Sequence, residues 1–156
     1  MNEYLPYDPG MLPSSPAPSA GEHIALKIKG FPPYKDLHFS LRNSRHKNYA
    51  RFVILRQAAI KAMAGRAPYR GGVRLDFVMH APDFETNRGY ADYLGGILDS
   101  LDGSHGKEFT YLPIVYEDDC QVACSSAFSE DIEIWYELRI VFLGRDWRTE
   151  SSNTQR

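Results

Sequence analysis

Apolar residues alternate with polar residues in three stretches of the chain, and this period of two is typical of strands with one buried face. The first stretch spans residues 23–29, with Ile24, Leu26 and Ile28 on one side. The second spans residues 73–80 and the third spans residues 130–143, where Ile132 and Ile134 begin the apolar face. A short apolar run at 112–116 and the stretch 120–127 complete the predicted strands.

Two further stretches repeat at helical spacing. Residues 45–64 form a cationic amphipathic helix in this interpretation, with Ser44 as N-cap and Gly65 as C-cap. Residues 90–101 carry the clearest helical pattern, because apolar side chains recur at i, i+3, i+4, i+7, i+8 and i+11 from Tyr90. The order of elements predicts an α+β domain, a small mixed or antiparallel sheet with two helices.

The second predicted helix contains two adjacent glycines, Gly95 and Gly96. Each glycine inside a helix costs roughly 1 kcal/mol relative to alanine, so a close neighbour should require a bare backbone there. We expect this neighbour to be a second subunit or a nucleic-acid backbone. The alternative is that the glycines thin a helix that packs against a strand. At 100° per residue, Asp92 and Asp99 lie about 20° apart on the side opposite the apolar stripe.

Composition divides the chain into a domain and two tails. Residues 1–20 hold five of the ten prolines, and we predict a disordered proline-rich tail over 1–21, a domain over 22–144 and a flexible tail over 145–156. The sequence has no apolar run of eighteen residues and no basic-then-apolar pattern at its start. These features predict a protein without a membrane segment and a cytoplasmic location.

The net charge of −2 conceals a separation of charge along the sequence. Residues 24–74 contain twelve Lys and Arg against one acid, whereas residues 76–139 contain fourteen acids against three bases. This separation is typical of a surface for a phosphate backbone beside an acidic site. The alternative is two solvated faces that pair with each other.

Three consecutive acids, Glu117, Asp118 and Asp119, follow the short apolar run. Adjacent carboxylates repel each other, so they are either fully solvated in a turn or neutralised by a divalent cation. Oxygen ligands of this kind suit Mg²⁺ or Mn²⁺. Together with Asp92 and Asp99 on one helix face, they favour a metal site.

Several of these segments resemble the RusA family of Holliday junction resolvases over about residues 23–143. The resemblance is carried by G-F-P-P-Y-K at 30–35, N-Y-A-R at 48–51, G-V-R-L-D-F at 72–77, D-Y-L-G-G-I-L-D-S-L-D-G at 92–103 and I-V-Y-E-D-D-C-Q-V at 114–122. It implies a homodimeric, Mg²⁺-dependent endonuclease that resolves four-way DNA junctions. Implied catalytic residues are Asp92, Asp99, Asp118 and Asp119, with Asp92, Asp118 and Asp119 as metal ligands and Mn²⁺ as a possible substitute ion.

The resemblance also implies DNA contacts and shows where this chain departs from the family. The expected phosphate-binding residues are Lys35, Arg42, Arg45, Lys47, Arg51 and Arg56. The family pattern D-x-D-N-x-x-K, aligned without gaps from Asp99, places its two aspartates on Gly89 and Ala91, its asparagine on Asp92 and its lysine on Gly95. A shift of one residue puts Asp92 in place of the second aspartate, and Lys35 or Lys107 could replace the lysine.

Two alternatives stay open at this point. One is a catalytically decayed protein of the same fold that still binds DNA junctions. The other is a non-enzymatic dimeric interaction protein, in which the acids are a solvated face.

Overall fold

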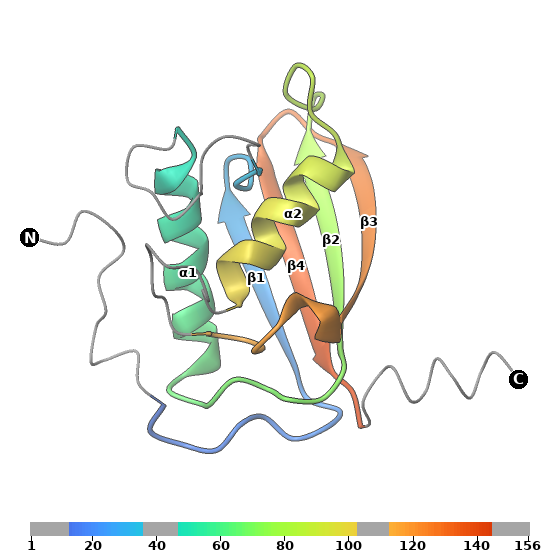
Figure 1. The fold of residues 1–156 in the computed structure, drawn as a ribbon. Coiled ribbons are helices and arrows are strands. Elements are labelled where there is room, and N and C mark those ends of the chain that lie inside the picture. The colour runs from blue at the N-terminus through green and yellow to red at the C-terminus, as the bar shows by residue number, and fades with distance from the viewer. Residues whose placement is uncertain (1–12, 36–46, 103–112, 145–156) are drawn as a thin grey trace, which may run out of the picture.

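A four-stranded mixed sheet, covered on one face by two helices, forms the body of the protein (Figure 1). The computed structural model describes residues 13–35, 47–102 and 113–144. Its elements, in chain order, are β1 (His23–Lys29), α1 (Tyr49–Met63), β2 (Val73–Ala81), α2 (Tyr90–Leu101), the 3-10 helix η2 (Asp119–Gln121), β3 (Val122–Glu130) and β4 (Trp135–Phe142). The predicted α+β class with a mixed sheet and two helices is confirmed.

The strands lie in the order β1-β4-β2-β3. β4 pairs antiparallel with both β1 and β2, while β3 pairs parallel with β2. In this register Leu138 of β4 lies between Leu26 and Phe77, which places the apolar halves of three strands on the same face. The helices cover this face, and together they bury the core. The alternation seen in the sequence therefore arises because only one face of the sheet is covered.

One predicted strand segment is wrong, and another is longer than the strand in the structure. Residues 113–116 form bends and an isolated bridge between Tyr69 and Tyr116 in place of the predicted strand. The predicted strand at 130–143 is shorter, since β4 begins at Trp135 and residues 131–134 connect β3 to β4 around the end of β2. Ile132 and Ile134 therefore do not join the core, and their exposed fractions are 92% and 39%.

The ends of the predicted domain and helices also differ from the sequence pattern. α1 begins after Asn48 and ends at Met63, and its C-cap is Ala64, in the left-handed conformation with φ 53°, and not the predicted Gly65. Ser44, the predicted N-cap, lies outside the described residues, as do residues 1–12 and 145–156 of the predicted tails. Residues 13–21 belong to the predicted proline-rich tail, but Ser14 and Ser15 hydrogen-bond through their backbones to Gly65.

The segment 30–35 crosses α2 at its two glycines. A Cβ atom at Gly96 would lie 2.1 Å from the carbonyl oxygen of Pro33 and 2.8 Å from the Cα of Tyr34. At Gly95 it would meet the Lys35 side chain, 3.1 Å from Cδ. The close neighbour that the glycines require is thus this chain's own backbone and not a second subunit or a nucleic acid. The prediction of a close neighbour is confirmed, and its predicted identity is wrong.

Candidate metal centre

Three carboxylates meet where the end of α2 faces η2. Asp99 in the last turn of α2, Asp102 at its C-cap and Asp119 at the start of η2 each offer an oxygen atom, and these atoms all lie within 4.8 Å of one another. Asp99 and Asp102 are three residues apart, a spacing that places side chains on the same side of a helix. Asp102 is buried, Asp99 half-buried and Asp119 exposed, so the cluster opens to solvent on the η2 side.

The backbone around the end of α2 is held by Arg56. This arginine of α1 is fully buried, and its Nη1 donates to the carbonyl oxygens of Ser100 at 2.9 Å and Asp102 at 3.4 Å. A cation at this end also interacts favourably with the helix dipole. Arg56 therefore fixes the turn that presents Asp99 and Asp102. The prediction that Arg56 binds phosphate is wrong, because its guanidinium group lies inside the protein.

The η2 turn is held by side-chain hydrogen bonds within the acidic segment. Asp118 accepts a hydrogen bond from the backbone N–H of Cys120 at 3.0 Å and so caps the 3-10 helix. The Gln121 amide oxygen accepts from the N–H groups of Glu117 and Asp118, while its Nε2 donates to the carbonyls of Tyr69 and Gly71. These bonds explain why the sequence D-D-x-Q forms a turn, and this turn holds Asp119 beside α2.

Burial and neighbouring negative charge both make the Asp119 carboxyl a weaker acid. Burial raises the pKa of the Asp119 carboxyl, and the neighbouring Asp118 and Asp99 carboxylates raise it further. Lys35 acts in the opposite direction, since its Nζ lies 3.4 Å from the Asp99 carboxylate. A divalent cation would relieve the same repulsion more completely.

Asp92 lies apart from this cluster. Its carboxylate accepts a hydrogen bond from the N–H of Gly89 at 2.9 Å and so caps the first turn of α2. Seven residues separate it from Asp99, which is about 10 Å along a helix axis. Of the four aspartates predicted as catalytic, the structure brings Asp99 and Asp119 together, uses Asp118 to cap η2 and leaves Asp92 at the opposite end of α2.

Sequence reasoning missed Asp102. The signal was available, because Asp102 follows Asp99 by three residues and thus continues the same helix side. It was hidden because the predicted helix ends at Leu101, one residue before Asp102.

The predicted phosphate-binding residues have different surroundings. Arg51 forms a two-pronged ion pair with Glu85, at 2.7 and 3.1 Å, and is partly buried. Lys35 and Lys47 are exposed. Arg42 and Arg45 lie outside the described residues.

The cations Lys47 and Arg88 lie close to the Tyr34 ring. Arg88 was not among the predicted phosphate-binding residues. The Arg88 guanidinium lies 4.0 Å from the Tyr34 ring centroid, and the Lys47 Nζ lies 5.4 Å from it. Burial raises the pKa of the Tyr34 hydroxyl, but hydrogen bonds from Arg88, Asn48 and Lys47 outweigh burial and lower it. We call Tyr34, Lys47 and Arg88 the basic patch. It lies near the start of both helices, at the other end of α2 from the carboxylates.

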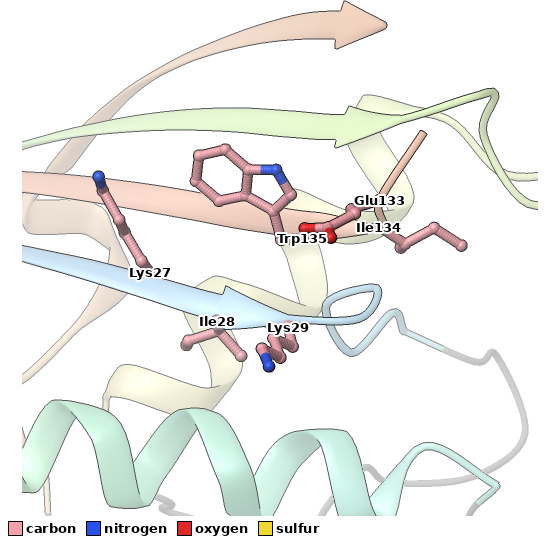
Figure 2. A pocket seen from close by; sticks show the side chains of 6 residues that line it. All are labelled: Lys27, Ile28, Lys29, Glu133, Ile134 and Trp135. Atoms are coloured by element: carbon pink, nitrogen blue, oxygen red, sulfur yellow. The ribbon is translucent and has the colours of Figure 1, made fainter. Parts of the chain in front are cut away.

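A pocket of ≈ 450 Å³ lies elsewhere, between the end of β1 and the start of β4 (Figure 2). Figure 2 shows the six side chains that line it, Lys27, Ile28, Lys29, Glu133, Ile134 and Trp135. The Trp135 ring stacks on His80 with 3.8 Å between ring centroids. The pocket shares no residue with the carboxylate cluster, so the two are separate features of the surface.

Comparison with known proteins identifies no relative: no family model matches the chain, and no curated protein is significantly similar to it. Among the described residues, no helix has both the length and the apolar character needed to cross a membrane. The carboxylate cluster and the basic patch are therefore the features of the molecule that point to a function.

Proposed function

We propose that the protein is a Mg²⁺-dependent endonuclease of the RusA type, which hydrolyses phosphodiester bonds in four-way DNA junctions. The observation that carries the proposal is the convergence of Asp99, Asp102 and Asp119 from two elements that are distant in sequence. Arg56 holds the end of α2 and Gln121 holds η2 through hydrogen bonds to backbone carbonyls, so the convergence is a consequence of the fold. Carboxylates brought this close repel each other unless a cation binds between them.

The cluster fits a small divalent ion. Mg²⁺ binds oxygen at about 2.1 Å, so two ligands of one ion lie about 3 to 4.2 Å apart. The three oxygens lie within 4.8 Å of one another, which is close to these distances. Asp99, Asp102 and Asp119 are therefore the proposed ligands, with Mn²⁺ as an alternative ion. Asp118 supports them by fixing η2.

The expected chemistry is hydrolysis. A bound Mg²⁺ activates water and stabilises charge on a phosphate group. The residues of this chain hold the ligands in place: Arg56 fixes the last turn of α2, and Gln121 fixes the turn that carries Asp119. Because η2 is exposed, a phosphodiester can approach the ligands from the solvent side.

Branched DNA is the proposed partner. The basic patch supplies positive charge at the start of α2, and the helix spans about 14 Å from Tyr90 to Asp99 at 1.5 Å per residue. Contacts of this kind position a phosphate backbone without reading its sequence. A four-way junction is cut on two strands, and a homodimer with one site per subunit accounts for paired cuts. The same proposal places the protein in the cytoplasm.

The test is cleavage of a labelled four-way junction compared with a linear duplex of the same sequence and length. We expect paired, Mg²⁺-dependent nicks on the junction, and losses of at least 100-fold in Asp99→Asn, Asp102→Asn and Asp119→Asn. Asp76→Asn is the matched control, because this half-buried aspartate pairs with Arg74 and lies outside the cluster. Binding without cleavage would favour the catalytically decayed alternative. Equal, weak binding to both DNAs would favour the interaction protein.

A further inference from the structure

The pocket between the end of β1 and the start of β4 contains a tryptophan that is held from two directions. The Trp135 ring stacks on His80 with 3° between the ring planes, and its Nε1 donates to the Asp131 carboxylate at 3.1 Å. One face of the indole is thus covered, while the residue as a whole is half-buried. A ring that is already fixed loses little conformational entropy when a second ring stacks on it.

The other face of the indole is turned toward Lys27. The Lys27 Nζ lies over the ring, 5.8 Å from its centroid, and because His80 covers one face, this ammonium group lies over the other. Figure 2 shows the lysine reaching from β1 toward the indole on the neighbouring strand β4. Stacked rings need about 3.5 to 4 Å between their atoms, so a planar ligand fits after a small outward movement of this exposed side chain. Trp135 therefore offers a stacking surface to a ligand in the pocket.

Two ammonium groups and one carboxylate surround this surface. Lys29 lies opposite Trp135 in the register of β1 and β4, and Lys27 lies two residues before it on the same face of the strand. Within the described part of the chain neither lysine forms an ion pair, so both charges are available to an anionic ligand. The exposed Glu133 carboxylate lines the same pocket and can accept a hydrogen bond from an amino group.

This combination of groups selects the class of ligand. A cationic ligand would be repelled by the two lysines, and a purely apolar ligand would remove water from three charged groups without replacing their hydrogen bonds. A simple anion would leave the indole without a partner. A ligand with both a planar ring and a phosphate group matches all of these side chains, and the pocket volume of ≈ 450 Å³ is in the range of small-molecule sites.

We propose that the pocket binds a nucleotide whose base stacks on Trp135 and whose phosphate group binds Lys27 and Lys29. Glu133 accepts a hydrogen bond from the exocyclic amino group of adenine, cytosine or guanine, a group that thymine lacks. Stacking on an aromatic side chain and contacts from lysines to phosphate are general means of holding a nucleotide. A free nucleotide and an unpaired nucleotide of a DNA strand share this chemistry. The pocket is separate from the carboxylate cluster, and the proposal does not depend on nuclease activity.

The experiment follows the fluorescence of Trp135 alone. Trp147→Phe leaves Trp135 as the only tryptophan in the sequence, and this variant is the reference protein. It is titrated in EDTA, so that no strand is cut, with deoxyadenosine monophosphate and with a short single-stranded oligodeoxyadenylate. We expect saturable quenching, with affinity reduced about tenfold or more in Lys27→Ala/Lys29→Ala and unchanged in Lys61→Ala. Lys61→Ala is the matched control, because Lys61 is an exposed lysine in the last turn of α1.

Two ligand comparisons test the roles of the phosphate and of the carboxylate. Deoxyadenosine, which lacks the phosphate, should bind at least about tenfold more weakly than its monophosphate. Thymidine monophosphate should bind about threefold more weakly than deoxyadenosine monophosphate, and Glu133→Ala should remove most of this preference. Oligodeoxythymidylate gives the same comparison for a strand. Circular dichroism of each variant separates a loss of affinity from a loss of fold.

The outcomes distinguish the two sources of the ligand. Saturable quenching by the monophosphate assigns the pocket to free nucleotides, quenching by the oligodeoxyadenylate alone assigns it to unpaired nucleotides of a strand, and both support the proposal. Three results would overturn it: no saturable quenching by either ligand, a folded lysine double variant that binds as tightly as the reference protein, or inorganic phosphate that competes as well as the monophosphate. Junction cleavage is measured separately, so failure of the proposed nuclease function leaves these results unchanged.

Discussion

Replacing Gly96 with alanine should distort the contact between α2 and the segment 30–35. The added Cβ would lie 2.1 Å from the Pro33 carbonyl oxygen and 2.5 Å from its carbon, and both partners are backbone atoms that cannot rotate away. Separating them to ordinary contact requires a shift of about 1 Å. Overpacking of this kind costs about 1 to 3 kcal/mol or more, and the better helix propensity of alanine returns about 1 kcal/mol. Because both clashing atoms are backbone, the upper end of this range applies, and we expect a net loss of about 2 kcal/mol in the free energy of unfolding.

The adjacent glycine supplies a control with the same chemistry. Gly95→Ala meets only the Lys35 side chain, whose closest atom is 3.1 Å away and flexible. It should be neutral or stabilising by up to about 1 kcal/mol. Urea unfolding of both variants, followed by circular dichroism, measures the difference. A Gly96→Ala protein as stable as Gly95→Ala would refute the view that the 30–35 backbone seats directly on α2.

Three further outcomes are expected. Arg56→Met should lose about 2 kcal/mol of unfolding free energy, because the buried carbonyl of Ser100 loses its hydrogen-bond donor. Arg70→Met, at an exposed position, is the control and should change the free energy of unfolding by less than about 0.5 kcal/mol. Equal urea midpoints for the two variants would contradict the structural role of the buried arginine. Burial raises the pKa of Glu85, but hydrogen bonds from Arg51 and Tyr93 outweigh burial and lower it. The ionised carboxylate therefore stabilises the fold fully above about pH 4.5, and this contribution is lost as the pH falls through the lowered pKa of the folded state. Glu85→Gln should flatten that part of the stability curve, and an unchanged acid limb would argue against the pair. Lys47→Ala should reduce the salt dependence of junction binding by about one unit of log–log slope, and a slope identical to wild type would exclude this lysine as a phosphate contact.

Local pattern predicted the elements that have a single clear period. β1 and α2 were predicted with their observed bounds, since alternation and helical spacing each identify one buried face there. The neighbours of these elements were not predictable in the same way. Nothing local indicates that β4 inserts between β1 and β2, because strand pairing depends on residues far apart in sequence.

The site was predicted only in part, again because some of its contacts join residues that are far apart in sequence. Arg56 lies four residues after Phe52 and so falls on the covered face of α1, a position that its charge concealed. The acidic segment at 117–119 was identified from sequence, but its meeting with Asp102 depends on how the chain returns from α2 to η2. The glycines of α2 indicated a close approach, and only the fold could identify segment 30–35 as the neighbour.

Binding of Mn²⁺ to the protein without DNA tests the metal centre most directly. Calorimetry on wild type, Asp119→Asn, Asp102→Asn and Asp92→Asn separates the cluster from the helix cap at the other end of α2. We expect one ion per chain in wild type and in Asp92→Asn, and affinity reduced at least tenfold in Asp119→Asn and Asp102→Asn. Unchanged affinity in the two cluster variants, or binding lost only in Asp92→Asn, would contradict a metal centre formed by Asp99, Asp102 and Asp119.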